Sequence, residues 1–255
     1  MIEKAKYWFL FFLNYKNFFE LISNKFLGKR NKKICLRNNL KIFGRETTPL
    51  LVVVDEVFLF KRYTPKYLLI KKGDIVVDIG AHVGVFSLMA SRQGASKVFA
   101  YEPDLENVKM IQMNVKFNNL KKIFVRNLAI SNKRANIKLF LAKGDASNTL
   151  FKNFFDVTSD NFQIIKSVKL EDVFRLEKIK KIDFLKIDCE GAEGLIFKST
   201  PAKIWKNINK IAMEYHDTVS PLSHQKISKY LLSQGYLVKI MPLGNGQGYL
   251  YAYKH

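Results

Sequence analysis

Cysteine and long apolar runs are both scarce in this chain. Cys35 and Cys189 are its two cysteines, and they have neither metal-ligand nor redox spacing. No stretch approaches the ~20 consecutive apolar residues needed to cross a bilayer. The apolar run at residues 7–13 lacks the small-residue cleavage site of a signal peptide. These absences predict a reduced, cytoplasmic protein without a cysteine-bound metal or a membrane span.

Acidic residues are scarce as well. The 255 residues include 22 Asp and Glu but 43 Lys and Arg, which gives a formal charge of +21 at pH 7. Such a charge favours an anionic partner, namely nucleic acid, an acidic membrane face or an acidic substrate. The lysines are spread along the whole chain, however, so a general composition bias explains the charge equally well.

The first 37 residues combine aromatic with basic side chains. Nine Lys and Arg stand against two Glu in this segment. Its apolar residues recur at three- and four-residue steps, which predicts an amphipathic helix. Two interpretations stay open: peripheral contact with an anionic membrane through residues 1–30, or packing on the domain or on a second subunit. The recurring residues are Trp8, Phe11, Phe12, Tyr15, Phe19, Ile22 and Phe26.

A change of pattern near residue 70 suggests two parts. Residues 34–43 contain two apolar runs around an Asn-Asn turn, and residues 49–60 are β-branched and aromatic, so short strands are expected in both segments. From Gly73 onward, strand and helix patterns alternate. We therefore divide the chain into an N-terminal helix with a β extension, residues 1–70, and an α/β domain, residues 71–255.

The α/β domain is predicted to be a doubly wound, mostly parallel sheet with helices on both faces. Its last two strand patterns are joined by the Gly-rich turn at residues 244–248, so the final strand must be antiparallel to its neighbour. A parallel sheet that ends in such a hairpin is typical of class I methyltransferases and not of dinucleotide dehydrogenases.

The stretch "VVDIGAHVGVFSLMA", residues 76–90, places an acid and two glycines between a strand and a helix. Gly80 and Gly84 have a spacing different from that of a pyrophosphate-binding loop, and Asp78 would repel a pyrophosphate. Asp78 instead suits the cationic amino acid end of S-adenosylmethionine. Glu102, 22 residues beyond Gly80 at the end of the next strand, is expected to accept hydrogen bonds from the ribose hydroxyls.

A second group of acids follows the strand "FLKID". Asp188 and Glu190 stand directly after it, and Glu193 opens the next helix. Candidates for a general base are these three acids and His216, which follows another strand. No metal is assigned, although Asp188, Glu190 and Glu214 form an alternative set of ligands for a hard divalent cation.

Four segments together resemble the FkbM family of S-adenosylmethionine-dependent methyltransferases. They are "GDIVVDIGAHVGVFSL", "VFAYEPDLENVKMIQMNVKFNNL", "LAISNKRANIKLF" and "FLKIDCEGAEGLIF", which span roughly residues 71–200. The resemblance implies S-adenosylmethionine as cofactor and O-methylation of a hydroxyl on a sugar, a glycan or a related natural product. His82 and Cys189 depart from it, since Asn and Val are usual there. Cys189 is interpreted as a small core residue.

The resemblance also assigns the binding residues. The methionine end of the cofactor would lie against Asp78, Gly80 and Gly84, the ribose against Glu102, and the adenine against Asn127 and Ala129. His82 and Pro103 complete the cofactor-binding set.

The predicted mechanism places the acceptor hydroxyl beside the acids. Asp188 and Glu190 orient it and take or relay its proton, with His216 as a further candidate base. The loop "GDASNTLF", residues 144–151, closes over the substrate, and Asn148, Thr149 and Glu193 complete the substrate-binding set.

Three rival functions are weaker. An RNA methyltransferase fits the charge, but the sequence lacks the catalytic motifs of base methylation and a separate RNA-reading module. A membrane-docked binding protein with a degenerate Rossmann-like domain would not retain both Asp78 and Glu102. A dehydrogenase is disfavoured by the glycine spacing.

Overall fold

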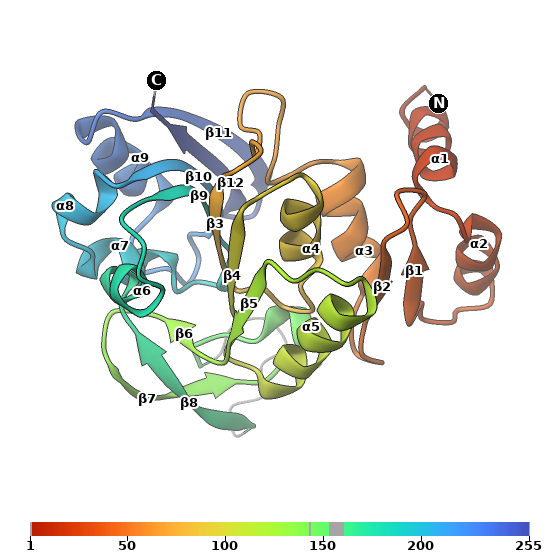
Figure 1. Cartoon of the computed structure of the whole chain (residues 1–255), viewed down its shortest axis with the longest axis horizontal. Helices are drawn as coiled ribbons and strands as arrows, with labels where there is room; N and C mark the ends of the chain where they lie inside the picture. The colour runs from red at the N-terminus through yellow and green to blue at the C-terminus, as the bar shows by residue number, and fades with distance from the viewer. Residues whose placement is uncertain (1, 143, 153–160, 255) are drawn as a thin grey trace.

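A computed structural model describes residues 2–142, 144–152 and 161–254. Within these ranges the central element is a seven-stranded sheet with α-helices on both sides (Figure 1). In spatial order its strands are β11 (Leu237–Gly244), β12 (Gln247–Tyr253), β10 (Ile208–His216), β9 (Ile182–Ile187), β3 (Ile75–Ile79), β4 (Lys97–Tyr101) and β5 (Ile123–Arg126).

The pairing of these strands confirms the predicted fold class. Strands β5, β4, β3, β9 and β10 are parallel to one another, whereas β12 is antiparallel to both β10 and β11. The chain moves outward from β3 to β4 and β5, and then returns to β9 on the other side of β3. In such sheets, ligands bind at the carboxyl ends of the strands next to this reversal.

Alternating side chains give the sheet two apolar faces. Val76 and Val98 belong to one buried cluster, and their neighbours Val77 and Phe99 belong to the other, because successive residues of a strand point to opposite sides. The first face is covered by α4 (Val85–Arg92) and α5 (Leu105–Phe117), the second by α6 (Leu170–Leu176), α7 (Glu193–Ser199), α8 (Ala202–Trp205) and α9 (His224–Ser233).

A smaller sheet stands next to the main one. It contains β6 (Ala129–Ile130), β8 (Phe162–Val168) and β7 (Ala135–Phe140), with β8 in the middle. Strands β5 and β6 follow each other closely in the sequence, but Asn127 and Leu128 separate them, and the two belong to different sheets. A 3-10 turn, η2 (Asp145–Ser147), follows β7.

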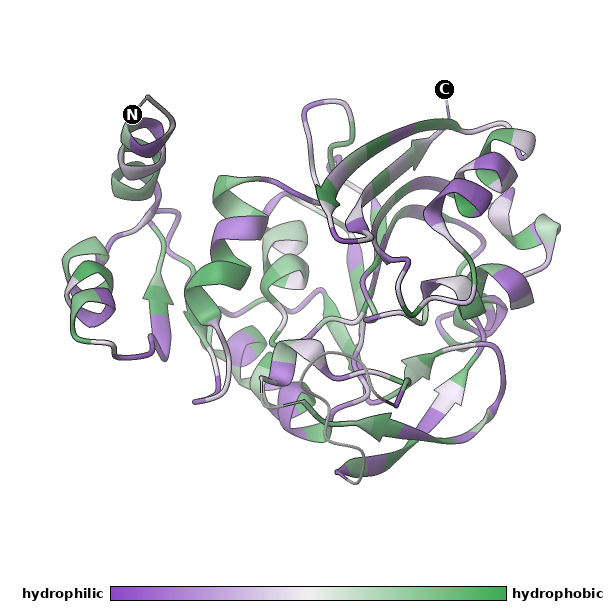
Figure 2. Cartoon of the chain, turned by 180° about the vertical axis from the view of Figure 1, so that it is seen from behind, coloured by the Kyte–Doolittle hydropathy of each residue, from purple (hydrophilic) through white to green (hydrophobic). Residues whose placement is uncertain are grey.

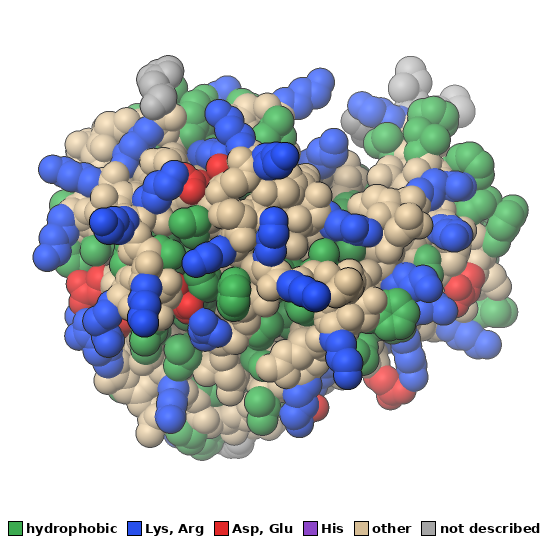
Figure 3. All heavy atoms as spheres, in the orientation of Figure 1, with side chains coloured by type: hydrophobic (Ala, Val, Ile, Leu, Met, Phe, Trp, Pro, Cys, Tyr) green, Lys and Arg blue, Asp and Glu red, His purple; other side chains and the backbone are tan. Residues whose placement is uncertain are grey.

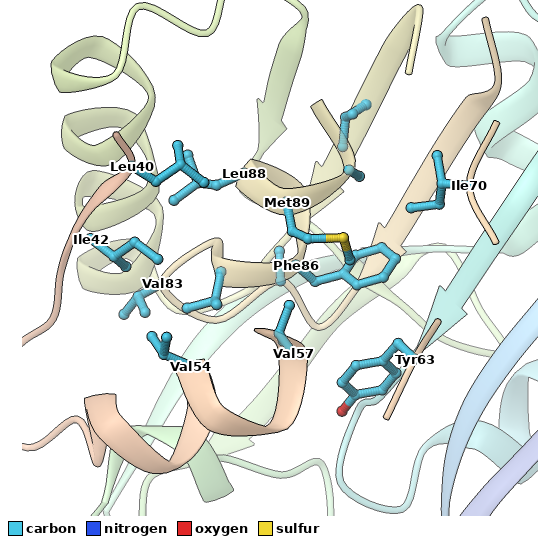
Figure 4. Packing of buried hydrophobic residues seen from close by; sticks show 14 of the residues in the cluster. Leu40, Ile42, Val54, Val57, Tyr63, Ile70, Val83, Phe86, Leu88 and Met89 are labelled. Atoms are coloured by element: carbon cyan, nitrogen blue, oxygen red, sulfur yellow. The ribbon is translucent and has the colours of Figure 1, made fainter. Parts of the chain in front are cut away.

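The predicted strand at residues 49–60 is wrong. The segment forms α3 (Leu50–Val54), which continues into the π-helical turn η1 (Asp55–Leu59). Leu50, Val54 and Val57 lie on one side at helical spacing and are buried against the first face of the sheet. Figure 4 shows Val57 beside Phe86 of α4 and Val54 beside Val83. Burial of this helical stripe outweighs the β propensity of the Val residues.

The N-terminal segment forms two helices instead of the single predicted one. Helix α1 (Ile2–Asn14) ends where the backbone N–H of Lys16 donates to the carbonyl of Cys35, and α2 (Phe18–Phe26) follows. The predicted hairpin is present as β1 (Lys33–Cys35) and β2 (Lys41–Phe43). In Figure 1 this arm stands beside the domain, next to α3.

Candidate active site

A cavity opens at the carboxyl ends of β3, β4, β9 and β10. Its empty space is about 1240 Å³, a volume that includes the open solvent at its mouth. One wall comes from α3 and η1, the other from the loops after the strands. Predicted site residues that line it are Gly80, His82, Glu102, Pro103, Ala129, Asn148, Asp188 and Glu190; Tyr63, Glu56, Asn107, Asp145, Lys186 and Glu214 also line it.

Glu102 is fixed in the half of the cavity next to β3 and β4. One oxygen of its carboxylate accepts from the backbone N–H of His82 at 2.8 Å, and the other accepts from that of Asp104 at 2.9 Å. Burial raises the pKa of Glu102 to about 7, against the opposing effect of these hydrogen bonds. Each oxygen keeps a second lone pair for a ligand hydroxyl, so the residue fits its predicted role at the ribose.

The glycines of the first loop are required by packing. A Cβ on Gly80 would lie 1.7 Å from the carbonyl oxygen of Asp188, and one on Gly84 would lie 3.1 Å from the side chain of Ile111. Both glycines have positive φ angles, +73° and +88°. We expected these positions to leave room for a ligand, but the space belongs to neighbouring protein atoms, and Gly84 does not line the cavity.

Asp78 lies below the cavity floor and not at its surface. It is fully buried, accepts a hydrogen bond from Ser87 at 2.7 Å, and lies 3.3 Å from the ammonium group of Lys186. Lys186 in turn donates to the carbonyl of Gly80 at 2.6 Å. The charge of Asp78 is therefore compensated inside the protein, which corrects the expectation that it faces the amino acid end of the cofactor.

Asn127 lies outside the wall of the cavity half next to β3 and β4, which we call the cofactor half. Its amide donates to the carbonyl oxygens of Glu102 and Pro103, and its side chain is not part of the cavity wall. His82, in contrast, lines the cavity, with a φ of +53° that His tolerates better than most residues. Its Nε2 lies 3.3 Å from Asp145 of η2, so the loop after β7 closes onto the cofactor loop.

The other half of the cavity contains three carboxylates, Asp188, Glu190 and Glu214, which we call the acceptor cluster. The hydroxyl of Tyr63 lies 2.8 Å from Asp188 and 2.9 Å from Glu214, and so connects β9 to β10. Lys186 lies 3.3 Å from Asp188 and 5.2 Å from the centre of the Tyr63 ring. Lys186 is therefore a buried cation that the cluster shares with Asp78.

The three carboxyl groups of the acceptor cluster have pKa values shifted in different directions. Although burial opposes it, the charges of Lys186 and His216 and the Tyr63 hydrogen bond hold the pKa of Asp188 below its usual value. Burial raises the pKa of Glu214 to about 7 and that of Glu190 well above its usual value, and the other carboxylates add to both shifts. Two of the three acids are therefore poised to hold a proton near neutral pH.

His216 and Glu193 lie behind the acceptor cluster. Both are buried, neither lines the cavity, and His216 Nδ1 is 3.3 Å from Glu193. Burial alone would lower the pKa of His216, but the Glu193 hydrogen bond and the charges of Glu193 and Glu190 raise it to about 10. His216 is therefore an imidazolium at neutral pH, and the expectation that it acts as a base is corrected. Glu193 has no access to a substrate.

The two predicted residues of the 144–151 loop have different places. Asn148 lines the cavity and donates to Asp104 at 3.0 Å. Thr149 is buried outside the cavity wall and donates to the carbonyl of Glu190 at 2.6 Å. Thr149 thus supports Glu190, whose φ is +51°, and does not reach a substrate.

Metal binding was left open by the sequence. Ligand atoms of Asp188, Glu190 and His216 lie within 4.8 Å of one another, a group that includes His216 in place of the expected Glu214. Lys186 and Tyr63 already contact the Asp188 carboxylate, so a cation there would compete with both. Cys189 lines the cavity beside this group, and burial raises the pKa of its thiol, which keeps it protonated and a poor nucleophile.

Sequence reasoning missed Tyr63, Glu56 and Lys186. Lys186 had a visible signal, because it is the one basic residue of the strand "IDFLKI" and stands between two apolar residues. Tyr63 and Glu56 had none, since both were assigned to the N-terminal extension, residues 1–70, and Glu56 lies in the segment predicted as a strand.

The comparisons with known proteins agree with this geometry. The family model described as a methyltransferase FkbM domain matches residues 78–238. "Methyltransferase 1" of the fungus Beauveria bassiana is 23% identical over 229 residues, which cover 82% of this chain and 90% of that protein. A ribosomal protein L11 methyltransferase of Thermotoga neapolitana is 34% identical over 154 residues, 60% of this chain and 50% of that one.

A solved structure has a similar fold. The crystal structure of methyltransferase FkbM from Methylobacillus flagellatus superposes with a TM-score of 0.53 at 16% identity, over 83% of this chain and 56% of that chain. This chain thus spans little more than half of that protein. The family match covers more than half of the present chain and includes both Glu102 and the acceptor cluster. The chain therefore belongs to the FkbM family and is an S-adenosylmethionine-dependent methyltransferase.

Proposed function

We propose that this protein transfers a methyl group from S-adenosylmethionine to a hydroxyl oxygen of a sugar, a glycan or a related natural product. The observation that carries the proposal is the wall of the acceptor half, where Glu56 joins the acceptor cluster. The described part of this wall offers carboxylate oxygens as hydrogen-bond acceptors, and its one ammonium group, that of Lys186, is already held by Asp78 and Asp188. Hydroxyl groups are the matching donors.

The cofactor supplies a methyl group that its sulfonium already activates. The protein then has two tasks, to position the acceptor oxygen and to receive its proton. Asp188, ionised and held by Tyr63 and Lys186, suits the first task because it accepts hydrogen bonds without taking the proton. Glu214 suits the second, because a carboxylate with a pKa near 7 is an effective general base at neutral pH. Glu190 lines the cavity beside it and can share or relay the proton.

An RNA acceptor fits the cavity less well, despite the charge of +21. Figure 3 shows Lys and Arg side chains scattered over the face it displays, without one continuous patch. The ionised carboxylate of Asp188 repels a phosphate placed beside it. A neutral, hydroxyl-rich acceptor has no such penalty.

The test is a methyl-transfer screen with labelled cofactor over neutral sugars and glycosides, with RNA as the competing substrate. Single-turnover rates of Glu190→Gln and Glu214→Gln are then measured at equal cofactor occupancy. Each variant should be slower by about 100-fold, because a positioned base contributes that order of acceleration. The matched control is Glu171→Gln, which changes a surface partner of Arg134. Undiminished rates, or transfer to RNA alone, would eliminate the proposal.

A further inference from the structure

The N-terminal arm, residues 2–37, is anchored to the domain by a few buried side chains. Phe11, Tyr15 and Leu21 are at most 2% exposed. The hydroxyls of Tyr15 and Tyr7 donate to the carboxylate of Asp55 in η1, at 2.5 and 2.9 Å. Since Glu56 follows Asp55 and lines the cavity, the arm is fixed directly beside the site.

The same arm leaves large apolar side chains in water. On α2, Phe19 is 77% and Phe26 is 86% exposed. Scattered single exposures are ordinary, but a concentration within twenty residues marks an interaction surface. Figure 2 shows green, hydrophobic residues on both helices of the arm, and Figure 3 shows such side chains along its outer side. The exposed set is Trp8, Phe9, Phe12, Leu13, Phe19, Phe26 and Leu27.

Basic side chains surround these apolar residues. The ammonium group of Lys25 lies 5.6 Å from the centre of the Trp8 ring, and the guanidinium of Arg37 lies 5.0 Å from that of Phe12. Residues 1–37 contain nine Lys and Arg but two Glu. Aromatic rings bordered by cations match a bilayer surface, where rings enter the headgroup layer and cations meet lipid phosphates.

Other occupants fit this surface less well. If the arm of a second copy packed against this one, the nine Lys and Arg of each arm would repel those of the other. A nucleic acid would satisfy the cations but leave the aliphatic side chains Leu13 and Leu27 in water. Among the described residues, no helix is both long and apolar enough to cross a membrane, so contact with lipid would be parallel to the surface.

We propose that the exposed apolar and basic face of residues 2–37 docks this enzyme on anionic lipid bilayers. The docked arm holds the cavity next to the membrane through Asp55 and Glu56. This inference concerns binding alone and does not depend on the identity of the methyl acceptor.

The test uses the full chain, since deletion of the arm would remove Tyr15 from the core. Binding is measured by co-sedimentation with phosphatidylcholine vesicles, with and without about 30 mol% phosphatidylglycerol. Tryptophan emission gives a second readout: Trp205 is fully buried whereas Trp8 is 41% exposed, and the chain has two Trp. A blue shift on vesicle addition therefore reports Trp8.

We expect binding to anionic vesicles at least about tenfold tighter than to neutral ones, weakened by salt, with a blue shift. The pair Phe19→Ser and Phe26→Ser should weaken it about tenfold or more, as should Lys16→Glu with Lys29→Glu. Matched controls elsewhere on the surface, Leu232→Ser with Leu243→Ser and Lys121→Glu with Lys122→Glu, should bind like the parent. The proposal would be overturned if the parent did not bind vesicles, or if the controls lost as much binding as the arm variants. It would also be overturned if the parent self-associated and only the arm variants abolished this self-association.

Discussion

The two halves of the cavity are built in different ways. In the cofactor half, Glu102 is held by backbone N–H groups from a loop 20 residues earlier and from its own turn. In the acceptor half, Tyr63 reaches Asp188 across 125 residues and Glu214 across 151. The first half is thus a local motif, whereas the second exists only when distant segments pack together. Gly80 and Lys186 join the halves, so changes there should have the largest effects.

The largest effect is expected from Gly80→Ala. Its Cβ would overlap the Asp188 carbonyl oxygen, 1.7 Å away, in addition to the strain of its positive φ. We expect a loss of at least about 4 kcal/mol in the free energy of unfolding, measured with urea. Gly73→Ala is the matched control, because φ there is +92° with nothing within 4 Å, and strain alone costs about 1–2 kcal/mol. Equal losses would show that the halves do not meet at Gly80.

The next largest effect is expected from Lys186→Met. Its removal leaves Asp78 and Asp188 buried without their shared cation, which should cost about 3–5 kcal/mol in the free energy of unfolding. Lys181→Met removes an ammonium group that is 61% exposed and paired with Asp183, and should have a much smaller effect, because water screens an exposed ion pair. Similar costs for both variants would contradict a joining role for Lys186.

A smaller effect should separate the halves by ligand. Glu102→Gln is expected to weaken S-adenosylhomocysteine binding about tenfold or more, because hydrogen bonds to a charged group contribute about 1.5–3 kcal/mol. Calorimetry measures the dissociation constant, and Glu106→Gln, which alters an exposed pair with Lys109, serves as control. Glu190→Gln should leave the constant unchanged. If Glu190→Gln weakens binding as much as Glu102→Gln, the division into halves fails.

The smallest effect is expected from pH, which should change the methyl-transfer rate and the stability in opposite directions. Because the pKa of Glu214 is raised to about 7, the methyl-transfer rate should rise with pH and level off above about 7, and Glu214→Gln should remove much of this rise. Stability should change in the opposite direction. Glu102 and Glu214 bind protons more tightly in the folded than in the unfolded protein. Their protonation therefore stabilises the folded state fully below about pH 4.5, and this stabilisation is lost as the pH rises to about 7.

The measurement for this last prediction is a urea unfolding series between pH 4.5 and 8, run beside rate measurements over the same range. The Glu214→Gln variant should have a flatter stability curve than the parent. A stability that rises through this range by the same amount in parent and variant would contradict the raised pKa of Glu214.

The sequence predicted the sheet and its helices well, and predicted the site unevenly. The helix expected after Gly84 is present as α4 (Val85–Arg92), because a glycine start and an apolar helical pattern are local signals. Residues 49–60 were misread, since Leu50 and Val57 acquire their helical face only from packing on α4. Asp78 was assigned to the ligand for a similar reason: its partner Lys186 is 108 residues away.

The sequence by itself determined the fold class, through the alternation of strands and helices and the terminal hairpin, and the position of Glu102, through its spacing from Gly80. It also identified the cofactor, through the resemblance to the FkbM family. Only the tertiary structure decided which acids face the cavity, which are neutralised by Lys186, and why His216 is charged. Those properties depend on burial and on the distances between charges, and both are fixed only when β3, β9, β10 and the segment that contains Tyr63 come together.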